Sequence, residues 1–79
     1  MDRVKYIVFR AYDEVEKVII FSNFIKHVDI NPPGEILGAG FVCVTDGEYE
    51  CYGESVSLKV KSRPVSDTII VRKQIGSQL

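Results

Sequence analysis

The chain has no tryptophan, a single histidine, His27, and only two cysteines, Cys43 and Cys51, among its 79 residues. Secreted domains of this length usually need several cysteine pairs, so two cysteines argue against a disulfide framework. Two cysteines and one histidine also cannot complete a tetrahedral zinc site without help from carboxylates. We therefore expect two reduced structural cysteines, no structural metal and no cofactor.

Long apolar segments are also absent. The uninterrupted apolar stretches are far shorter than the roughly 20 residues that a membrane-spanning helix requires. The first ten residues, MDRVKYIVFR, do not contain the apolar core of a signal peptide. These features predict a cytoplasmic protein that does not associate with membranes.

Neither sign of charge dominates the sequence. Ten Lys and Arg residues against eleven Asp and Glu residues give a net charge of −1. Proteins that bind nucleic acids generally carry a basic excess, because they neutralise phosphates, so this class is disfavoured. Hydrophobic residues make up 46% and charged residues 27%, which is typical of a folded protein.

The length allows one domain, spanning residues 1–79. A chain this short buries only about 60% of the surface that it exposes when unfolded, so its core is thin. Association with a partner or a second copy would add buried surface, and a homodimer is therefore one expectation.

The N-terminal half predicts two strands. Residues 4–12, VKYIVFRAY, are rich in β-branched and aromatic side chains and apolar on both faces, which favours a central strand covered on two sides. Residues 16–21 predict a second strand, paired with the first in a hairpin. Residues 22–28 favour a single short helical turn, and the proline-containing segment that follows favours an exposed loop.

Residues 36–45 predict a third strand that contains Gly38 and Gly40. A glycine within a strand usually marks a bulge or a place where another group packs closely. The following Asp46-Gly47 pair favours a two-residue type I′ turn, with a returning strand over residues 48–52.

The register of this hairpin decides where the thiols lie. A two-residue turn pairs Cys43 with Glu50 and Val42 with Cys51, so the two thiols point to opposite faces. A three-residue turn would instead place the thiols directly opposite each other. We favour the first register.

The stretch GESVS at residues 53–57 matches part of the sequence motif of a nucleophile elbow. That motif requires a glycine on each side of the serine and a helix after it, and here Ser57 replaces the second glycine. Polar residues alternate with apolar ones up to Lys61, which instead predicts a half-buried strand with Ser55 and Ser57 facing outward. The chain is also too short for a hydrolase sheet, so we expect no enzyme activity.

The C-terminal part begins with Arg63-Pro64, which ends that strand. Ser66 suits a helix N-cap and Gly76 suits the position after a helix, so we predict a helix from Asp67 to Ile75. The β-branched run at residues 68–71 leaves a sixth strand as the alternative. If the segment is helical, the residues expected to pack on the sheet are Val65, Ile69, Ile70 and Ile75.

Together these elements predict an α+β, β-rich fold with about five mainly antiparallel strands and one short C-terminal helix.

Acidic side chains gather on the predicted hairpin and just after it. By period-two alternation, Glu48, Glu50 and Tyr52 share one face of the returning strand. We predict a partner-binding surface formed by Asp46, Glu48, Glu50, Tyr52 and Glu54, which suits a surface lined by Lys and Arg. The alternative is a solvated face whose charges discourage edge aggregation.

Basic side chains form a second candidate surface. Lys59, Lys61 and Arg63 would share one face of a strand, and such a stripe is a possible phosphate-binding site. The alternative is a solvent face that pairs with the acidic hairpin. His27 has no positioned partner in the sequence, so we expect it to be structural.

Four segments of the chain resemble those of a known group of proteins. They are YIVFR at residues 6–10, GAGFV at 38–42, CYGESVSL at 51–58 and SRP at 62–64. Through them the chain resembles a group of short uncharacterised proteins of bacterial prophages and other mobile elements. The resemblance carries no known activity and no site residue. It implies a small, cofactor-free protein that binds one host protein, for example to block a defence or replication enzyme.

The sequence therefore predicts a small non-catalytic protein-binding module, with a host protein as the expected partner. One alternative is a structural or assembly protein that associates with itself through an edge strand or the apolar second face of the first strand. The other alternative is a small nucleic-acid-binding protein.

Overall fold

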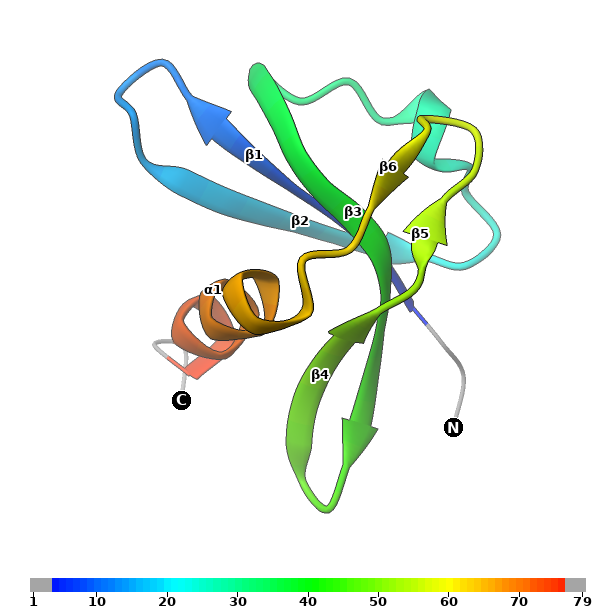
Figure 1. Ribbon diagram of the computed structural model, residues 1–79, viewed down its shortest axis with the longest axis vertical. Coiled ribbons are helices and arrows are strands. Elements are labelled where there is room, and N and C mark those ends of the chain that lie inside the picture. The colour runs from blue at the N-terminus through cyan, green and yellow to red at the C-terminus, as the bar shows by residue number, and fades with distance from the viewer. Residues whose placement is uncertain (1–3, 77–79) are drawn as a thin grey trace.

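The computed structural model describes residues 4–76, which contain six strands, a 3₁₀ helix and an α-helix (Figure 1). In chain order these elements are β1 (Val4–Ala11), β2 (Glu16–Ser22), η1 (His27–Asp29), β3 (Gly34–Thr45), β4 (Glu48–Tyr52), β5 (Glu54–Ser55), β6 (Val60–Lys61) and α1 (Pro64–Gly76). The predicted α+β, β-rich class is confirmed.

The main sheet has the strand order β2-β1-β3-β4, and all its neighbours are antiparallel. The predicted hairpin of β1 and β2 and the central place of β1 are confirmed. Strands β5 and β6 form a separate two-stranded sheet.

The β3–β4 hairpin has the predicted two-residue turn. Asp46 and Gly47 have φ angles of 52° and 80°, as a type I′ turn requires. Cys43 pairs with Glu50 and Val42 with Cys51, so the favoured register is confirmed. Both cysteines are free, and they lie on opposite faces of the sheet.

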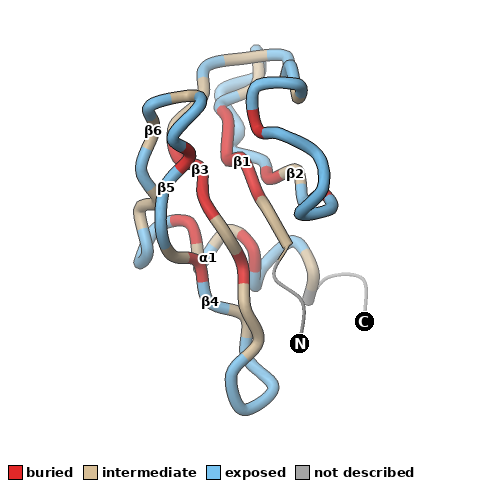
Figure 2. Tube along the Cα trace, turned by 90° about the vertical axis from the view of Figure 1, so that its right-hand side faces the viewer, coloured by how far each residue is buried: buried red, intermediate tan, exposed pale blue. Residues whose placement is uncertain are grey.

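Each face of the sheet carries its own hydrophobic cluster. On the α1 side, Val71 of the helix packs with Tyr6 and Val8 of β1. On the other side, Ile7 packs with Phe21 and Ala39, beneath partly buried residues that include Leu58 and Val60 of the β5–β6 segment. Residues 6–9 of β1 are all buried, as expected for a central strand covered on two sides (Figure 2).

The predicted strand over residues 55–61 is wrong. Residues 56–59 form a turn between β5 and β6, and Lys59 has a φ of 58°. Ser55 is 1% exposed rather than outward-facing, and Val56 is 80% exposed. The Ser55 hydroxyl accepts a hydrogen bond from the Leu58 N–H (3.2 Å), and this local bond closes the turn that interrupts the strand.

The predicted C-terminal helix is confirmed, but it begins earlier, with Pro64 at its first position. Ser66 is therefore not the N-cap, because the first helical hydrogen bond already runs from the Asp67 N–H to the Arg63 carbonyl (2.8 Å). The short helical turn predicted within residues 22–28 is replaced by the 3₁₀ helix η1.

The inward face of α1 also differs from the prediction. Val65 and Ile69 are 77% and 60% exposed, whereas Val71 is fully buried. Ile70 and Ile75 pack against the core as expected. The early start at Pro64 and the buried position of Asp67 set the rotation of the helix about its axis.

Candidate interaction surfaces

The β3–β4 hairpin extends beyond the rest of the molecule, and its tip is exposed (Figures 1 and 2). Tyr49 and Cys51 belong to the cluster beneath α1. Because side chains alternate along a strand, Glu48, Glu50 and Tyr52 belong to the opposite face of β4, as predicted.

Few of the hairpin carboxylates are neutralised within the chain. Glu48 lies 3.3 Å from Arg72 Nη2, in an exposed ion pair. No ion pair within 4.0 Å involves Asp46, Glu50 or Glu54 among residues 4–76. The hairpin therefore presents a local excess of negative charge on a molecule whose net charge is only −1.

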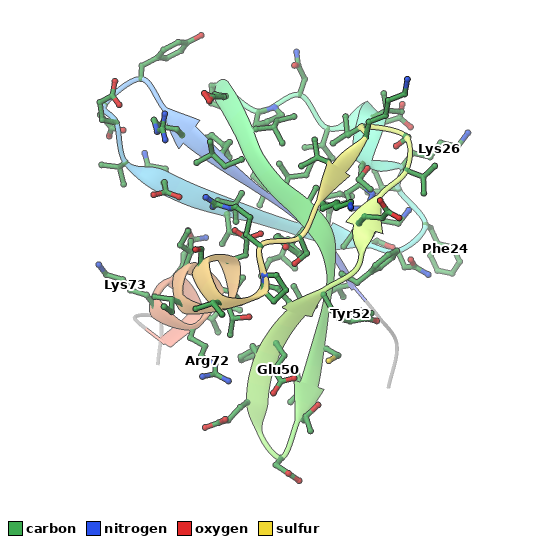
Figure 3. All side chains as sticks on the ribbon, viewed as in Figure 1. Phe24, Lys26, Glu50, Tyr52, Arg72 and Lys73 are labelled. Carbon is green, nitrogen blue, oxygen red and sulfur yellow. The ribbon has the colours of Figure 1, made fainter. Side chains whose placement is uncertain are left out.

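Tyr52 lies at the base of the hairpin and is half-buried (Figure 3). Its ring centroid is 5.8 Å from that of Phe41. The Phe41 ring in turn meets His27 edge-on at 5.9 Å. Tyr52 is thus anchored by aromatic packing, while the carboxylates nearer the tip are exposed.

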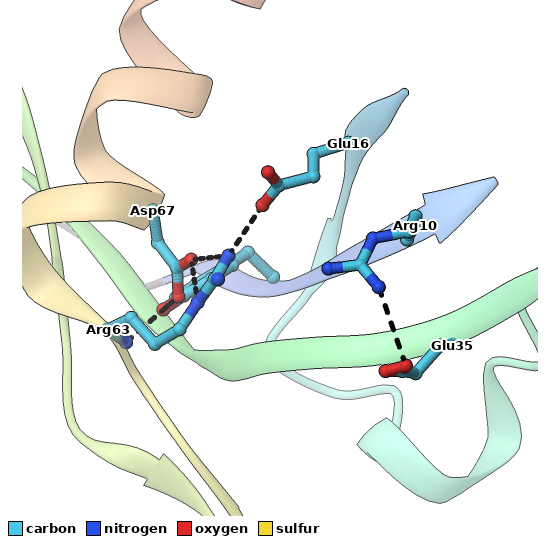
Figure 4. A network of polar contacts seen from close by, with 6 residues as sticks. Arg10, Glu16, Glu35, Arg63 and Asp67 are labelled. Atoms are coloured by element: carbon cyan, nitrogen blue, oxygen red, sulfur yellow. Dashed lines mark hydrogen bonds and ion pairs between the residues drawn. The ribbon is translucent and has the colours of Figure 1, made fainter. Parts of the chain in front are cut away.

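The basic residues Lys59, Lys61 and Arg63 do not share a strand face. Lys59 lies in the β5–β6 turn, and Lys61 in β6 pairs with Glu54 of β5. Arg63 is engaged by Glu16 (3.1 Å) and by Asp67 (2.8 Å), as Figure 4 shows. Burial lowers the pKa of its guanidinium, but the bonds to Glu16 and Asp67 outweigh this effect and the pKa is raised. Arg63 is therefore a structural cation.

Asp67 is the centre of a buried polar network that the sequence did not predict. Its side chain is fully buried. The carboxylate accepts hydrogen bonds from the Arg63 backbone N–H (2.9 Å) and Nε (3.0 Å), and from the Tyr6 hydroxyl (2.6 Å). The one feature of the sequence that could have indicated this network is Gly38, where a Cβ would collide with the Asp67 carboxylate.

Tyr6 connects β1 to this network. Its hydroxyl lies 2.6 Å from both Asp67 Oδ2 and Ser62 Oγ. Because a carboxylate only accepts, the phenol donates to Asp67 and the Ser62 hydroxyl donates to the phenol oxygen. Burial, followed by the bond to Asp67, raises the pKa of Tyr6 strongly, so it stays protonated and holds β1 against α1.

His27 is buried, and its environment is structural. Nε2 lies 2.9 Å from the Gly40 carbonyl, and the ring packs edge-on against Phe21. Burial lowers the pKa of the imidazole, the charge of Lys5 lowers it further, and the Gly40 carbonyl opposes the change. Neutral His27 therefore donates one hydrogen bond to β3 and packs among aromatic rings.

The cysteines and the serine of the GESVS stretch also have local structural partners. Burial raises the pKa of the Cys51 thiol to about 11, so it is a poor nucleophile at neutral pH. Cys43 Sγ lies 3.9 Å from the Thr45 hydroxyl. The Ser55 hydroxyl accepts the hydrogen bond from the Leu58 N–H that closes the β5–β6 turn.

Residues 4–76 contain neither a metal-ligating cluster nor a membrane-spanning helix. They contain no group of three or more His, Cys, Asp or Glu side chains placed to hold a metal ion. No helix in this range is long and apolar enough to cross a membrane.

Comparison with known proteins gives no relative from which a site can be transferred. No protein-family model matches the chain, and no curated protein or solved structure is significantly similar to it. The surfaces of the molecule therefore have to be interpreted from their own geometry and charge.

Proposed function

We propose that the protein is a small protein-binding module that docks its acidic hairpin onto a basic surface of a host protein, such as a defence enzyme. The observation that carries the proposal is the projection of the β3–β4 hairpin, which presents Asp46, Glu48 and Glu50 beyond the rest of the chain (Figure 1). Glu54 and Tyr52 extend the same surface toward the body of the molecule.

The chemistry of the hairpin favours a partner lined by Lys and Arg. Exposed carboxylates on a projecting element attract a basic partner from a distance and orient it before contact. Tyr52 adds an aromatic side chain already fixed by Phe41, so it loses little conformational freedom on binding. A Lys- and Arg-lined surface that normally grips nucleic acid phosphates has the required charge.

Phosphate binding by the basic residues is not proposed as the main function. Arg63 would have to leave both Glu16 and Asp67 to contact a phosphate.

The proposal is tested by charge reversal on the hairpin. Tagged wild-type protein is incubated with bacterial lysate, the captured protein is identified, and its binding is then measured with purified components. We expect E48K/E50K/E54K to lose binding, because the attraction to a basic surface becomes repulsion.

A matched control reverses the same number of charges elsewhere. The control, E14K/D29K/E35K, changes three exposed carboxylates outside the hairpin and gives the same net charge. It should retain binding. Equal loss in both triple variants would assign binding to overall charge, and retention in the hairpin variant would rule out this surface.

A further inference from the structure

The solvent-facing side of α1 carries two large apolar side chains among polar ones. Val65 and Ile69 are 77% and 60% exposed, and they are four residues apart on the same face of the helix. Toward the C-terminal end of α1, Arg72 and Lys73 lie on either side of this face (Figure 3). Val71, which is buried, points the other way into the core.

Ile69 forms a ridge between two surface grooves. One, of about 500 Å³, lies between α1 and the start of β2 and is lined by Val15 and Ile70. The other, of about 340 Å³, lies between α1 and β4 and is lined by Pro64 and Cys51. A ridge with a groove on each side is the shape into which the ridge of another helix packs.

The routes to self-association expected from the sequence are partly covered by α1. The outer edge of β4 is bonded by α1, because the Cys51 N–H donates to Thr68 and the Tyr49 carbonyl accepts from Arg72. At the edge of β2, Gln74 bonds both backbone groups of Val18. Both faces of β1 are covered.

We propose that a second copy of this chain docks on α1, with the two helices antiparallel about a two-fold axis near Ile69. Each Val65–Ile69 ridge then lies in a groove of the other copy. A two-fold contact is self-complementary, and one patch that holds both a ridge and its grooves meets that requirement.

Charge supports the antiparallel arrangement. Of the two cations at the C-terminal end of α1, Arg72 is paired with Glu48 of the same chain, whereas Lys73 makes no ion pair within 4.0 Å among residues 4–76. Near its N-terminal end, Glu50, which also makes no such ion pair, lines the same groove as Pro64 and Val65. Antiparallel packing brings Lys73 of each copy toward Glu50 of the other.

The first test measures the oligomeric state of the full chain across a concentration series by sedimentation velocity. We expect the wild type to dimerise weakly, with a dissociation constant in the micromolar range. I69D should weaken the dimer about tenfold or more, because it buries two carboxylates at the axis. F24D is the matched control, because Phe24 is 95% exposed and lies outside α1.

The second test fixes the relative orientation of the helices. With Ile69 on the axis of an antiparallel pair, position 66 of one copy lies opposite Lys73 of the other, because the two positions are about two helical turns apart on the same side of α1. S66E should therefore tighten the dimer roughly tenfold, and S66K should weaken it by a similar factor, because each change acts twice. A parallel pair would show no such opposite effects.

The outcomes separate the alternatives. A wild type that stays monomeric at millimolar concentration overturns the proposal, as does a dimer that dissociates with F24D but not with I69D. I69D leaves the tip of the acidic hairpin unchanged, so capture of a basic partner by I69D separates failure of this proposal from failure of the hairpin proposal.

Discussion

Asp67 joins three separate parts of the chain through one carboxylate. It holds Tyr6 of β1 and Arg63 before α1, and Arg63 extends the connection to Glu16 of β2. A buried carboxylate is tolerated only when its charge and its hydrogen-bonding capacity are satisfied, and here both are. No buried side-chain nitrogen or oxygen in residues 4–76 lacks a partner.

Substituting Asp67 tests the importance of this network. D67N keeps the shape but removes the charge opposite Arg63 and places an amide donor among existing donors. We expect a loss of about 3 kcal/mol in the free energy of unfolding, measured by urea denaturation. D29N, an exposed substitution of the same type, should change stability by less than about 0.5 kcal/mol. A D67N variant as stable as D29N would contradict this account.

At the scale of elements, α1 covers one face of the sheet, and its side chains also form hydrogen bonds with backbone groups at the two edges of the sheet. Side chains of the helix bond some backbone groups of both edge strands: Thr68 and Arg72 bond Cys51 N–H and the Tyr49 carbonyl on β4, and Gln74 bonds Val18 on β2. The Gln74 amide donates to the Val18 carbonyl and accepts from the Val18 N–H, as a paired residue of an antiparallel strand would. These bonds protect the middle of each edge from pairing with other chains.

Amide hydrogen exchange separates the contributions of the two edges. Q74A should speed exchange of the Val18 amide and leave the Cys51 amide protected. T68V should do the reverse, because Thr68 is the acceptor of the Cys51 N–H. Each lost bond should lower stability by about 1 kcal/mol. Equal deprotection of both amides in either variant would mean global unfolding instead of local edge opening.

At the scale of the whole molecule, two small hydrophobic clusters share one strand. Tyr6 and Val8 of β1 belong to the cluster beneath α1, and Ile7 belongs to the cluster on the other face. Neither cluster keeps its packing if β1 leaves the sheet. We therefore expect the chain to unfold as one cooperative unit.

The single histidine provides a probe for this cooperativity. His27 packs on the face opposite α1, next to Phe21. V71A should remove about 2 kcal/mol of stability from the helix side. The urea midpoint from helical circular dichroism and the midpoint from the His27 ring proton resonance should fall together. A lower helical midpoint with an unchanged His27 midpoint would show two independent units.

Local sequence patterns determined much of this fold. The alternation and composition of residues 4–12, 16–21 and 36–45 predicted three strands, because these preferences act between near neighbours. Asp46-Gly47 fixed the turn and therefore the hairpin register, since a type I′ turn admits few other residues. The placement of the acidic residues on one hairpin followed from the same local rules, so that candidate surface was predicted from sequence.

Tertiary contacts decided the features that local sequence patterns did not predict. The strand pattern of residues 55–61 was overridden because Ser55 turns inward and its hydroxyl closes a turn, leaving Lys59 and Arg63 on different elements. Asp67 fits the first turn of an ordinary helix, and its place at the centre of a buried network depends on contacts far away in the sequence, such as the bond to Tyr6, 61 residues away. That contact, with the burial of Val71, also sets which side of α1 faces water. Ile69 is exposed for this reason. Helical spacing predicts which residues share a face of the helix, but the surface against which the helix packs decides which face is buried.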